Sequence, residues 1–442
     1  MRLFPSLPAQ VPSLDIKLPT GLKLPTGLGR RSGQDLVGLD IQPGFVAAVR
    51  ARVNGSIVAE RAAALALPGD AVRDGEVMDE QALSETLREL FSGSGLGKRV
   101  RVGVANQRTV LRTLELPPVT DHKELQAAVN FQAQDQVPMP LNNAVMDFHP
   151  LGIVDTPAGP RQRVVLVAAQ RDMIERLLAA VRHAGLTPEG VDLAAFALIR
   201  AMHRHDPEQT GRVLYLNVDG LSNLAIAEGT VCRFTRVVGG GLEGMAGELA
   251  ERRSIPVSEA REILAKVDLT APPAPQPGAG EAPEPEVQEP AAQAQAEDGE
   301  PGGEEAAAPV PSQEAAEEQE RSMSYEELAG VEAIDEPEPV AQISSSDPDV
   351  LTVVENGIRD ISGEVRNSLD FHRSQEGGGE VSHVVLSGSA QDIPGFAQAL
   401  QGSLGVEVRC HELNVAGEHL ADGLSPHRLA VATGLAAAEV PQ

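Results

Sequence analysis

The chain has 442 residues, a formal net charge of −28 at neutral pH and few aromatic residues: nine Phe, two Tyr and no Trp. Such an acidic, aromatic-poor sequence lacks the positive field and the stacking side chains with which proteins bind nucleic acids. It also has no apolar run of membrane-spanning length, no signal-peptide core, and only two cysteines. We therefore expect a cytoplasmic protein without a transmembrane helix or a disulfide scaffold.

The acidity is concentrated in one segment, residues 271–350. This segment holds 21 Asp or Glu, 13 Pro and a single basic residue, Arg321, and its net charge is −20. Because it has few large apolar side chains to bury, it cannot offset the entropy lost on folding, and its composition predicts disorder. The rest of the chain carries a net charge of −8. Residues 1–35 are expected to form a flexible arm.

The ordered part is predicted to begin with a three-stranded meander. Its short apolar runs are rich in Val and Ala, and turn residues separate them. The predicted elements, in chain order, are strands at 36–41, 45–53 and 56–67, an amphipathic helix at 79–91 and a strand at 99–104. An Asn-Gly pair between the second and third strands is a strong hairpin signal.

The same pattern returns in the second half of the chain. Strands are predicted at 213–218, 223–227 and 231–238, followed by three glycines and a helix at 242–252. When the two meanders are overlaid, Asp40 falls on Asn217 and Gln42 falls on Asp219. The repeat predicts an internal duplication, although two unrelated meanders in an α/β protein would give a similar pattern.

Other predicted elements lie between the two meanders and after the acidic segment. In chain order they are a helical face at 125–129, a buried strand at 164–168, a helix at 173–181, a long amphipathic helix at 354–369, a strand at 384–386, a Ser-Gly-Ser-Ala loop at 387–390 and a closing helix at 429–438. Repeated strand–turn–strand units that end in carboxylates suit a phosphate clamp, because tight turns present backbone N–H groups to phosphate oxygens. Carboxylates at the strand ends can hold a hydrated Mg²⁺ ion.

The sequence resembles the actin-like ATPase superfamily and, within it, the PilM proteins of type IV pilus assembly, relatives of the division protein FtsA. The stretches that carry this resemblance are 36–49, 112–117, 131–140, 147–148, 184–188, 191–192, 238–241, 368–375 and 386–390. The resemblance implies a duplicated actin-like (RNase H-like) α/β fold with an FtsA/PilM-type extra subdomain and a long disordered acidic insertion.

The implied domain organisation follows this family frame. It comprises a flexible arm (1–35), the first actin-like core (36–106), the extra subdomain (107–190), a return to the first domain (191–210), the first part of the second domain (211–270), the acidic insertion (271–350), the second part of the second domain (351–426) and a C-terminal helix on the first domain (427–442).

The resemblance also implies a function. Members of this family act as cytoplasmic scaffolds at the inner face of the cytoplasmic membrane, where they dock the tail of an inner-membrane PilN-like protein and meet other pilus assembly components; self-association is a further expectation. The docking residues expected here are Phe131, Val137, Pro138, Met139 and Phe148. A groove lined by 130–150 and the first meander is the expected docking site.

ATP and Mg²⁺ are the ligands that the resemblance implies. The expected nucleotide-binding residues are Asp40, Gln42, Gly44, Asn217, Asp219, Gly220, Gly239, Gly240, Gly388, Ser389 and Ala390, with Asp40 and Asp219 as the metal carboxylates. The first loop departs from the family pattern, because Gln42 replaces a glycine, Pro43 lacks an N–H donor and Ala48 stands where a lysine is expected. We expect no ATPase activity or a weak one and predict no catalytic residue; bound ATP, an empty cleft and a competent ATPase all stay open.

Three alternatives stay open on the sequence alone. One is the cytoplasmic actin-like component of a type II secretion platform, which normally continues into a transmembrane helix that this sequence lacks. A second is a divergent small-molecule kinase of the same superfold, which would need an intact first loop. A third is a filament-forming division protein, which would end in an amphipathic membrane helix, whereas 429–440 has no basic residue.

Overall fold

The computed structural model describes residues 36–54, 56–157, 159–204, 211–270, 347–375, 377–416 and 424–437. The chain divides into one unit of Met1–Pro273 with Ser344–Gln442 and a second unit of Ala274–Ile343. All the described residues belong to the first unit. The prediction of a flexible arm at 1–35 lies outside the described residues, and so does the predicted disordered segment 271–350 up to residue 346. At its last four residues the prediction of disorder is wrong, because Asp347 caps α7 and 348–350 form the first turn of that helix.

The first domain is built on a five-stranded sheet with the order β10-β6-β1-β2-β3. Its strands are β1 (Val37–Gln42), β2 (Phe45–Asn54), β3 (Ser56–Ala66), β6 (Arg99–Val104) and β10 (Thr187–Leu193). The first three pair antiparallel as the predicted meander, while β6 pairs in parallel with both β1 and β10. Every residue of β1 is buried because helices cover both faces of the sheet.

The second domain repeats this arrangement in a sheet with the order β13-β12-β11-β14-β15. Its strands are β11 (Arg212–Val218), β12 (Ser222–Glu228), β13 (Val231–Val238), β14 (Val381–Ser387) and β15 (Val408–Cys410). Again three strands form an antiparallel meander, and β14 pairs in parallel with β11 and β15. The matching strand orders and directions confirm the duplication predicted from the sequence.

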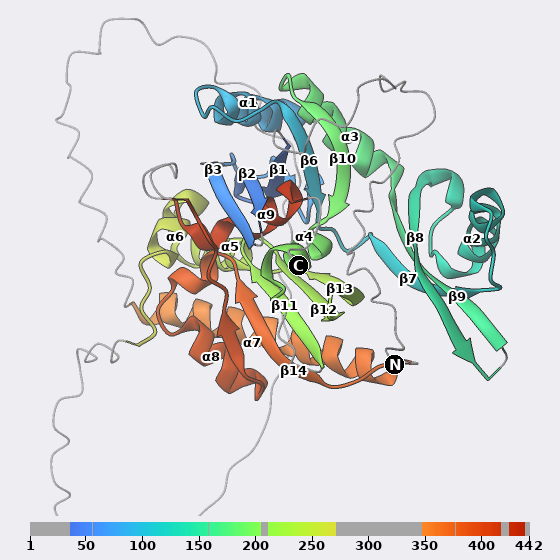
Figure 1. Cartoon of the computed structure of the whole chain (residues 1–442). Helices are drawn as coiled ribbons and strands as arrows, with labels where there is room; N and C mark the ends of the chain where they lie inside the picture. Colours follow the sequence, from blue (N-terminus) through green and yellow to red (C-terminus); the bar gives the residue numbers. More distant parts are fainter. Residues whose placement is uncertain are drawn as a thin grey trace, which may run out of the picture. The chain divides into compact units, whose positions relative to one another are not determined.

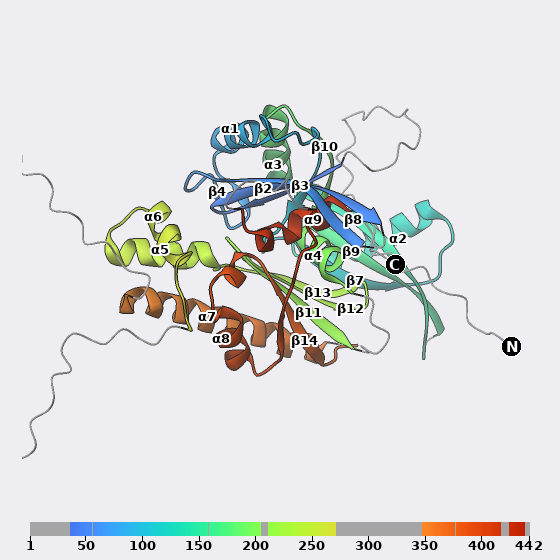
Figure 2. The same ribbon diagram turned by 60° about the vertical axis from the view of Figure 1, so that its left-hand side comes forward.

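Two helices lie between the sheets, as Figure 2 shows. They are α4 (Ala194–Met202), which packs on β11 and β12, and α9 (Ala430–Ala436), which packs on β1 and β2. Glycines let them approach their neighbours closely: a Cβ on Gly434 would lie 1.9 Å from the carbonyl oxygen of Ala197, and one on Gly38 would lie 1.9 Å from that of Ala432. The last helix in the chain thus completes the first domain.

Further helices surround the two sheets (Figure 1). On the first domain, α1 (Glu80–Phe91) and α3 (Arg171–His183) pack against each other, and a small ribbon of β4 (Val72–Arg73) and β5 (Glu76–Val77) lies beside them. On the second, α7 (Pro348–Ser374) packs on α8 (Phe396–Leu404) and α5 (Leu242–Arg253), and α6 (Val257–Leu264) packs on α5. Asp79 caps α1 and Asp347 caps α7, since each side chain accepts from backbone N–H groups of the first turn.

The extra subdomain has a core of its own. Its sheet has the order β7-β9-β8, and its elements are β7 (Val110–Leu116), α2 (His122–Gln136), η1 (Leu141–Asn143), β8 (Ala144–Thr156) and β9 (Gly159–Gln170). Buried apolar residues of α2, β7 and β9 form a separate hydrophobic cluster, and Leu141 of η1 with Met146 and Phe148 of β8 pack against it. Helix α3 lies within the expected bounds of this subdomain, but its apolar face packs on α1 and belongs to the main hydrophobic core; the boundary at 190 stays a prediction.

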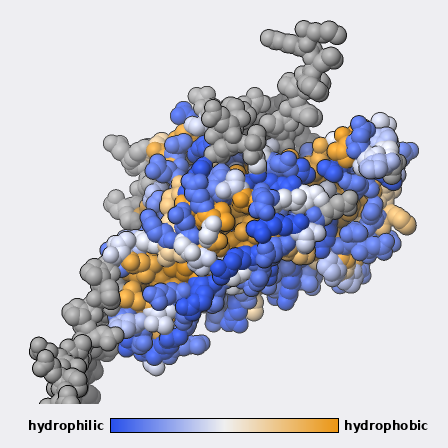
Figure 3. Space-filling view, turned by 90° about the horizontal axis from the view of Figure 1, so that it is seen from below, coloured by the Kyte–Doolittle hydropathy of each residue, from blue (hydrophilic) through white to orange (hydrophobic). Residues whose placement is uncertain are grey.

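The acidic insertion leaves and re-enters the second domain. On one side, the Leu269 amide donates to the Pro394 carbonyl, and on the other, Arg253 of α5 pairs with Asp347 and Asp349. None of the helices within the described ranges has a hydrophobic stretch that would cross a lipid bilayer. Seen from below, the surface is mostly hydrophilic, with separate hydrophobic patches (Figure 3).

Candidate functional site

The first turn of the predicted clamp joins β1 to β2. Asp40 and Gln42 are both buried, and the Gln42 side-chain amide donates to Asp40 Oδ1 at 3.1 Å. Gly44 has a φ of 87°, which favours glycine, and a Cβ there would lie 2.6 Å from Glu243 Oε2. This turn therefore reaches the helices of the second domain.

The second turn joins β11 to β12 and uses the same kinds of side chain. The Asn217 amide donates to Asp219 Oδ2 at 3.2 Å, and Ser387 Oγ donates to Asn217 Oδ1 at 2.9 Å. The backbone oxygen of Asp219 accepts the Leu242 N–H at 2.8 Å, which ties the turn to the start of α5. Asn217 and Asp219 are each 1% exposed.

The third loop, between β14 and η2 (Ser389–Asp392), contacts the second turn. Gly388 has a φ of 95°, and a Cβ on it would lie 2.3 Å from the Val218 carbonyl oxygen, so only glycine fits there. Ser389 donates to Asp219 Oδ1 twice, from its backbone N–H at 2.8 Å and from Oγ at 2.5 Å. Ala390 is fully buried. The structure thus brings the second turn and this loop together.

The two turns also meet each other directly. A Cβ on Gly220 would lie 2.2 Å from the Pro43 carbonyl oxygen, and the Leu221 N–H lies 3.4 Å from Gln42 Oε1, its acceptor. Gln42 therefore bridges the turns and occupies the space between them. The side chain that departs from the family pattern is the one that closes this gap.

Arg428, which the sequence did not single out, adds a cation to the site. It belongs to η3 (Pro426–Leu429), and its guanidinium carbon lies 4.5 Å from the Phe45 ring centroid. Its Nη2 donates to Ser389 Oγ at 3.1 Å, and its Nε lies 3.7 Å from Asp219 Oδ1. Arg428 thus joins the first turn to the second domain. No local motif marks it, because its partners come from three distant parts of the chain.

Burial changes the acidity of both aspartates. Desolvation, and next the charge of Asp219, raise the pKa of Asp40 to about 7. Desolvation also raises the pKa of Asp219, against the opposing effects of Arg428 and Ser389. Asp40 Oδ2 has no hydrogen-bond partner in the described part of the chain, and those residues contain no cluster of three metal-ligating side chains.

A cavity of about 380 Å³ opens beside the clamp. Residues from the first turn, α5, α6 and η2 line it, and a bidentate ion pair between Glu243 and Arg261 stands at its wall. Its volume suits a nucleoside-sized group. Between the turns, the Pro43 carbonyl and the Gln42 side chain approach Gly220 and Leu221, and both carboxylate oxygens of Asp219 already accept hydrogen bonds.

Two of the predicted glycines lie away from this cavity. A Cβ on Gly239 would lie 3.2 Å from Gln107 Nε2, and one on Gly240 would meet nothing within 4 Å. The glycine that approaches the second turn is Gly241, where a Cβ would lie 2.5 Å from the Asp219 carbonyl oxygen. The run of three glycines pointed to this loop, but the sequence could not show which of the three approaches the second turn.

The expected docking residues all lie in the extra subdomain. Phe131 on α2 is 74% exposed, whereas Val137 is buried in the core of the subdomain. Pro138 is exposed; Met139 and Phe148 are partly buried against that core, and the Phe148 ring stacks on His122 at 5.7 Å between centroids. In the sheet order, β6 and β10 lie between β1 and the sheet edge, and none of the more extensive contacts among the described elements joins the first meander to this subdomain. The expected groove stays a prediction.

The raised pKa of Asp40 predicts a specific pH dependence of stability. Since the folded state holds this proton up to about pH 7 and the unfolded state releases it near the ordinary value of 3.8, the free energy of unfolding falls as the pH rises between them. Asp40→Asn should remove this contribution, which is at most ~1.4 kcal/mol per pH unit. Urea unfolding from about pH 5 to pH 8 measures it. Equal pH slopes for the variant and the parent would contradict the prediction.

Comparison with known proteins bears on this fold. Residues 38–210 match the family model described as type IV pilus assembly protein PilM. Over both domains, the chain is similar to a chain in a solved structure of the PilM–PilN type IV pilus biogenesis complex, with a TM-score of 0.63 and 19% identity over 91% of this chain and 97% of that one.

Two other solved structures are less similar to the chain. The ethanolamine utilization protein EutJ from Carboxydothermus hydrogenoformans gives a TM-score of 0.44 at 15% identity, covering 90% of this chain and 88% of that chain. MreB5 of Spiroplasma citri bound to ADP gives 0.41 at 14% identity, covering 90% and 94%. The duplicated sheets and the likeness over both domains agree on an actin-like ATPase fold, and within it residues 38–210 match the PilM family model.

Proposed function

We propose that this protein is a cytoplasmic scaffold that docks the cytoplasmic tail of a PilN-like inner-membrane protein and so links a type IV pilus machine to the envelope. The observation that carries the proposal is the likeness, over both domains, to a chain solved in a PilM–PilN complex. The tail of the partner recruits the scaffold to the inner face of the membrane, and the scaffold contacts the membrane only through its partners.

The extra subdomain supplies the docking surface in this proposal. Its hydrophobic core is complete without Phe131, yet this large ring stands 74% exposed on α2. Exposed aromatic side chains are the usual anchors of protein interfaces. With Pro138 also exposed and Met139 partly so, an apolar surface on one side of the subdomain is left for a short apolar peptide.

Phe131→Ser should weaken the binding of the tail peptide at least about tenfold, because a buried aromatic anchor is worth ~2 kcal/mol or more. Titration of a labelled peptide from the N-terminal tail of a PilN-like partner, followed by fluorescence anisotropy, measures the affinity. Phe371→Ser is the matched control, since Phe371 is 53% exposed but lies on α7 of the second domain. Failure of the parent chain to bind at ~100 μM peptide would count against the proposal.

The nucleotide cleft plays a structural part in this proposal, with weak ATP binding and little turnover. The turns are bridged by Gln42, and Pro43 offers no N–H to a phosphate. Asp40 and Asp219 are the two carboxylates that would face a hydrated Mg²⁺ ion, and such an ion would offset the phosphate charge. With the two turns bridged by Gln42, the Asp219 carboxylate already accepts hydrogen bonds from Ser389 and Asn217.

Thermal unfolding with Mg²⁺ and ATP tests the cleft separately from the docking surface. We expect no resolvable shift at about 1 mM ATP, because the proposed binding is weak. A ligand present at 100 times its Kd would instead stabilise the fold by ~2.7 kcal/mol. A shift of that size would imply a Kd near 10 μM and a working nucleotide site. The scaffold proposal would survive that outcome.

A further inference from the structure

A second cavity lies where the chain crosses between the two domains. Its volume is about 690 Å³. One crossing leaves the end of α4 at Met202 and enters the second domain at Gly211, and the other runs from β15 through His411 back to the first domain. There the segment 414–416 bonds to Ala59 of β3, with Ala59 N–H donating to the Asn414 carbonyl at 2.9 Å.

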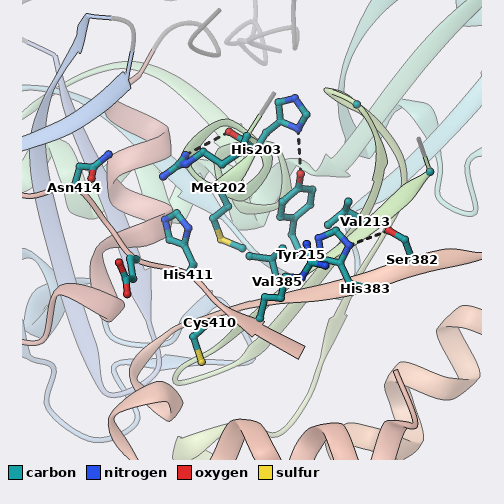
Figure 4. Close-up of a pocket in the computed structure, with 15 residues that line it drawn as sticks. Met202, His203, Val213, Tyr215, Ser382, His383, Val385, Cys410, His411 and Asn414 are labelled. Atoms are coloured by element: carbon teal, nitrogen blue, oxygen red, sulfur yellow. Dashed lines mark hydrogen bonds between the residues drawn. The ribbon is translucent and has the colours of Figure 1, made fainter. Parts of the chain in front are cut away.

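Polar rings surround this cavity (Figure 4). His203 Nδ1 lies 3.2 Å from the Tyr215 hydroxyl, and Ser382 Oγ lies 2.9 Å from His383 Nδ1. His383 and Tyr215 are buried, and so is His411. The apolar part of the lining comes from Met202, Val213 and Val385. The cavity thus combines apolar side chains with a few fixed polar groups, as ligand sites do.

His411 is the group in this cavity that lacks a partner. It is 6% exposed, its backbone N–H donates to the Leu386 carbonyl, and its ring nitrogen Nε2 has no hydrogen bond to any residue that the structure describes. Buried polar atoms are nearly always paired with protein, water or a ligand. An unpaired ring nitrogen beside a cavity of this size leaves a place for a partner that the described residues do not supply.

The charges around His411 favour an anion. Burial, then Arg204 and His427, lower its pKa to about 4, so the imidazole is neutral near pH 7 and offers one N–H donor. Desolvation and Arg409 lower the pKa of His383 against the opposing effect of Glu407. Glu407 pairs with Arg409 at 2.9 Å, and the remaining acid at the wall, Glu412, is exposed. A metal fits poorly, because no group of three metal-ligating side chains occurs within the described ranges.

We propose that this cavity binds a small molecule carrying an oxyanion, a phosphate or carboxylate group, with the N–H of His411 and the cation of Arg204 as its main contacts. The volume accepts ligands up to nucleotide size. Because residues of both interdomain crossings line the cavity, a bound ligand would touch both connections between the domains. This site is separate from the nucleotide cleft, and the proposal does not depend on the docking of a partner.

Nuclear magnetic resonance of the full chain with ¹³C-labelled histidine tests the proposal. The probes are inorganic phosphate and citrate, added at constant ionic strength. We expect saturable shifts of the His411 and His383 ring signals with at least one probe, while His149, on β8 of the extra subdomain, stays unchanged. Shifts with phosphate alone identify a phosphoryl ligand, and shifts with citrate alone identify a carboxylate ligand.

A variant locates the binding. His411→Phe keeps a ring of similar size but removes the N–H donor, and it should weaken the anion at least tenfold as read at His383; His149→Phe is the matched control. Unchanged affinity in His411→Phe would overturn the proposal, as would the absence of saturable shifts. Equal shifts at His149 would indicate ionic screening, and shifts confined to His427, beside the nucleotide cleft, would place the anion there; either result also overturns it.

Discussion

Gly38→Ala is expected to destabilise the protein by about 3 kcal/mol or more. The added Cβ would lie 1.9 Å from the Ala432 carbonyl oxygen and 2.5 Å from the Ala436 nitrogen. Both are backbone atoms of α9, so the clash cannot be relieved by a rotamer change. Either the helix lifts from β1 or the strand shifts. Urea unfolding of the variant and the parent measures the loss.

Gly363→Ala provides the control for this prediction. Gly363 lies in α7, and a Cβ added there meets nothing within 4 Å. Because alanine is a better helix former than glycine by ~1 kcal/mol, this variant should be as stable as the parent or slightly more so. If Gly38→Ala unfolds at the same urea concentration as Gly363→Ala, the close packing of α9 on β1 is wrong.

Arg200→Met should cost about 3–5 kcal/mol, because it leaves a buried carboxylate without its partner. Arg200 on α4 and Asp192 on β10 form an ion pair in which both side chains are fully buried. Arg200 also donates from Nε to the Gly434 carbonyl at 3.0 Å, and Asp192 accepts the Leu193 N–H at 2.8 Å. The pair therefore connects β10, α4 and α9 in the interior of the protein.

A double-mutant cycle separates the ion pair from simple loss of packing. Asp192→Ala with Arg200→Met removes both charges, so it should be less destabilised than the sum of the two single variants. Unfolding free energies of the four proteins give the coupling. Additive effects would mean that the two side chains do not stabilise each other, in contradiction to the geometry.

The secondary structure of the two domains was largely predictable because the local signals were strong. Both meanders have short buried strands separated by turn residues, and α3 and α7 keep regular apolar spacing. The edge of the extra subdomain was less predictable, because α3 looks the same in sequence whether it packs inside that subdomain or on α1. Only the tertiary contact decides the boundary.

The candidate site was also predictable where the signal is local and not where it depends on tertiary contacts. Asp40, Gln42, Asn217, Asp219 and Ser389 were found because each lies within two residues of the end of a strand, and the structure brings them together. The hydrogen bond between the two turns was not predictable, because the side-chain oxygen of Gln42 accepts from a backbone N–H that lies 179 residues away in the sequence.

Two further contributors were missed for the same reason. Arg428 and the Glu243–Arg261 pair have no motif and act through contacts distant in sequence.

The position of α9 has a consequence for how the protein is made. This helix covers β1 and β2, yet its residues 430–436 are translated more than 360 residues after those strands. The ribosome therefore releases the inner face of the first sheet long before its cover exists. Until then an exposed apolar sheet is available to chaperones and to aggregation. Nascent chains stalled before residue 430 should consequently be more sensitive to protease in the first domain than released protein.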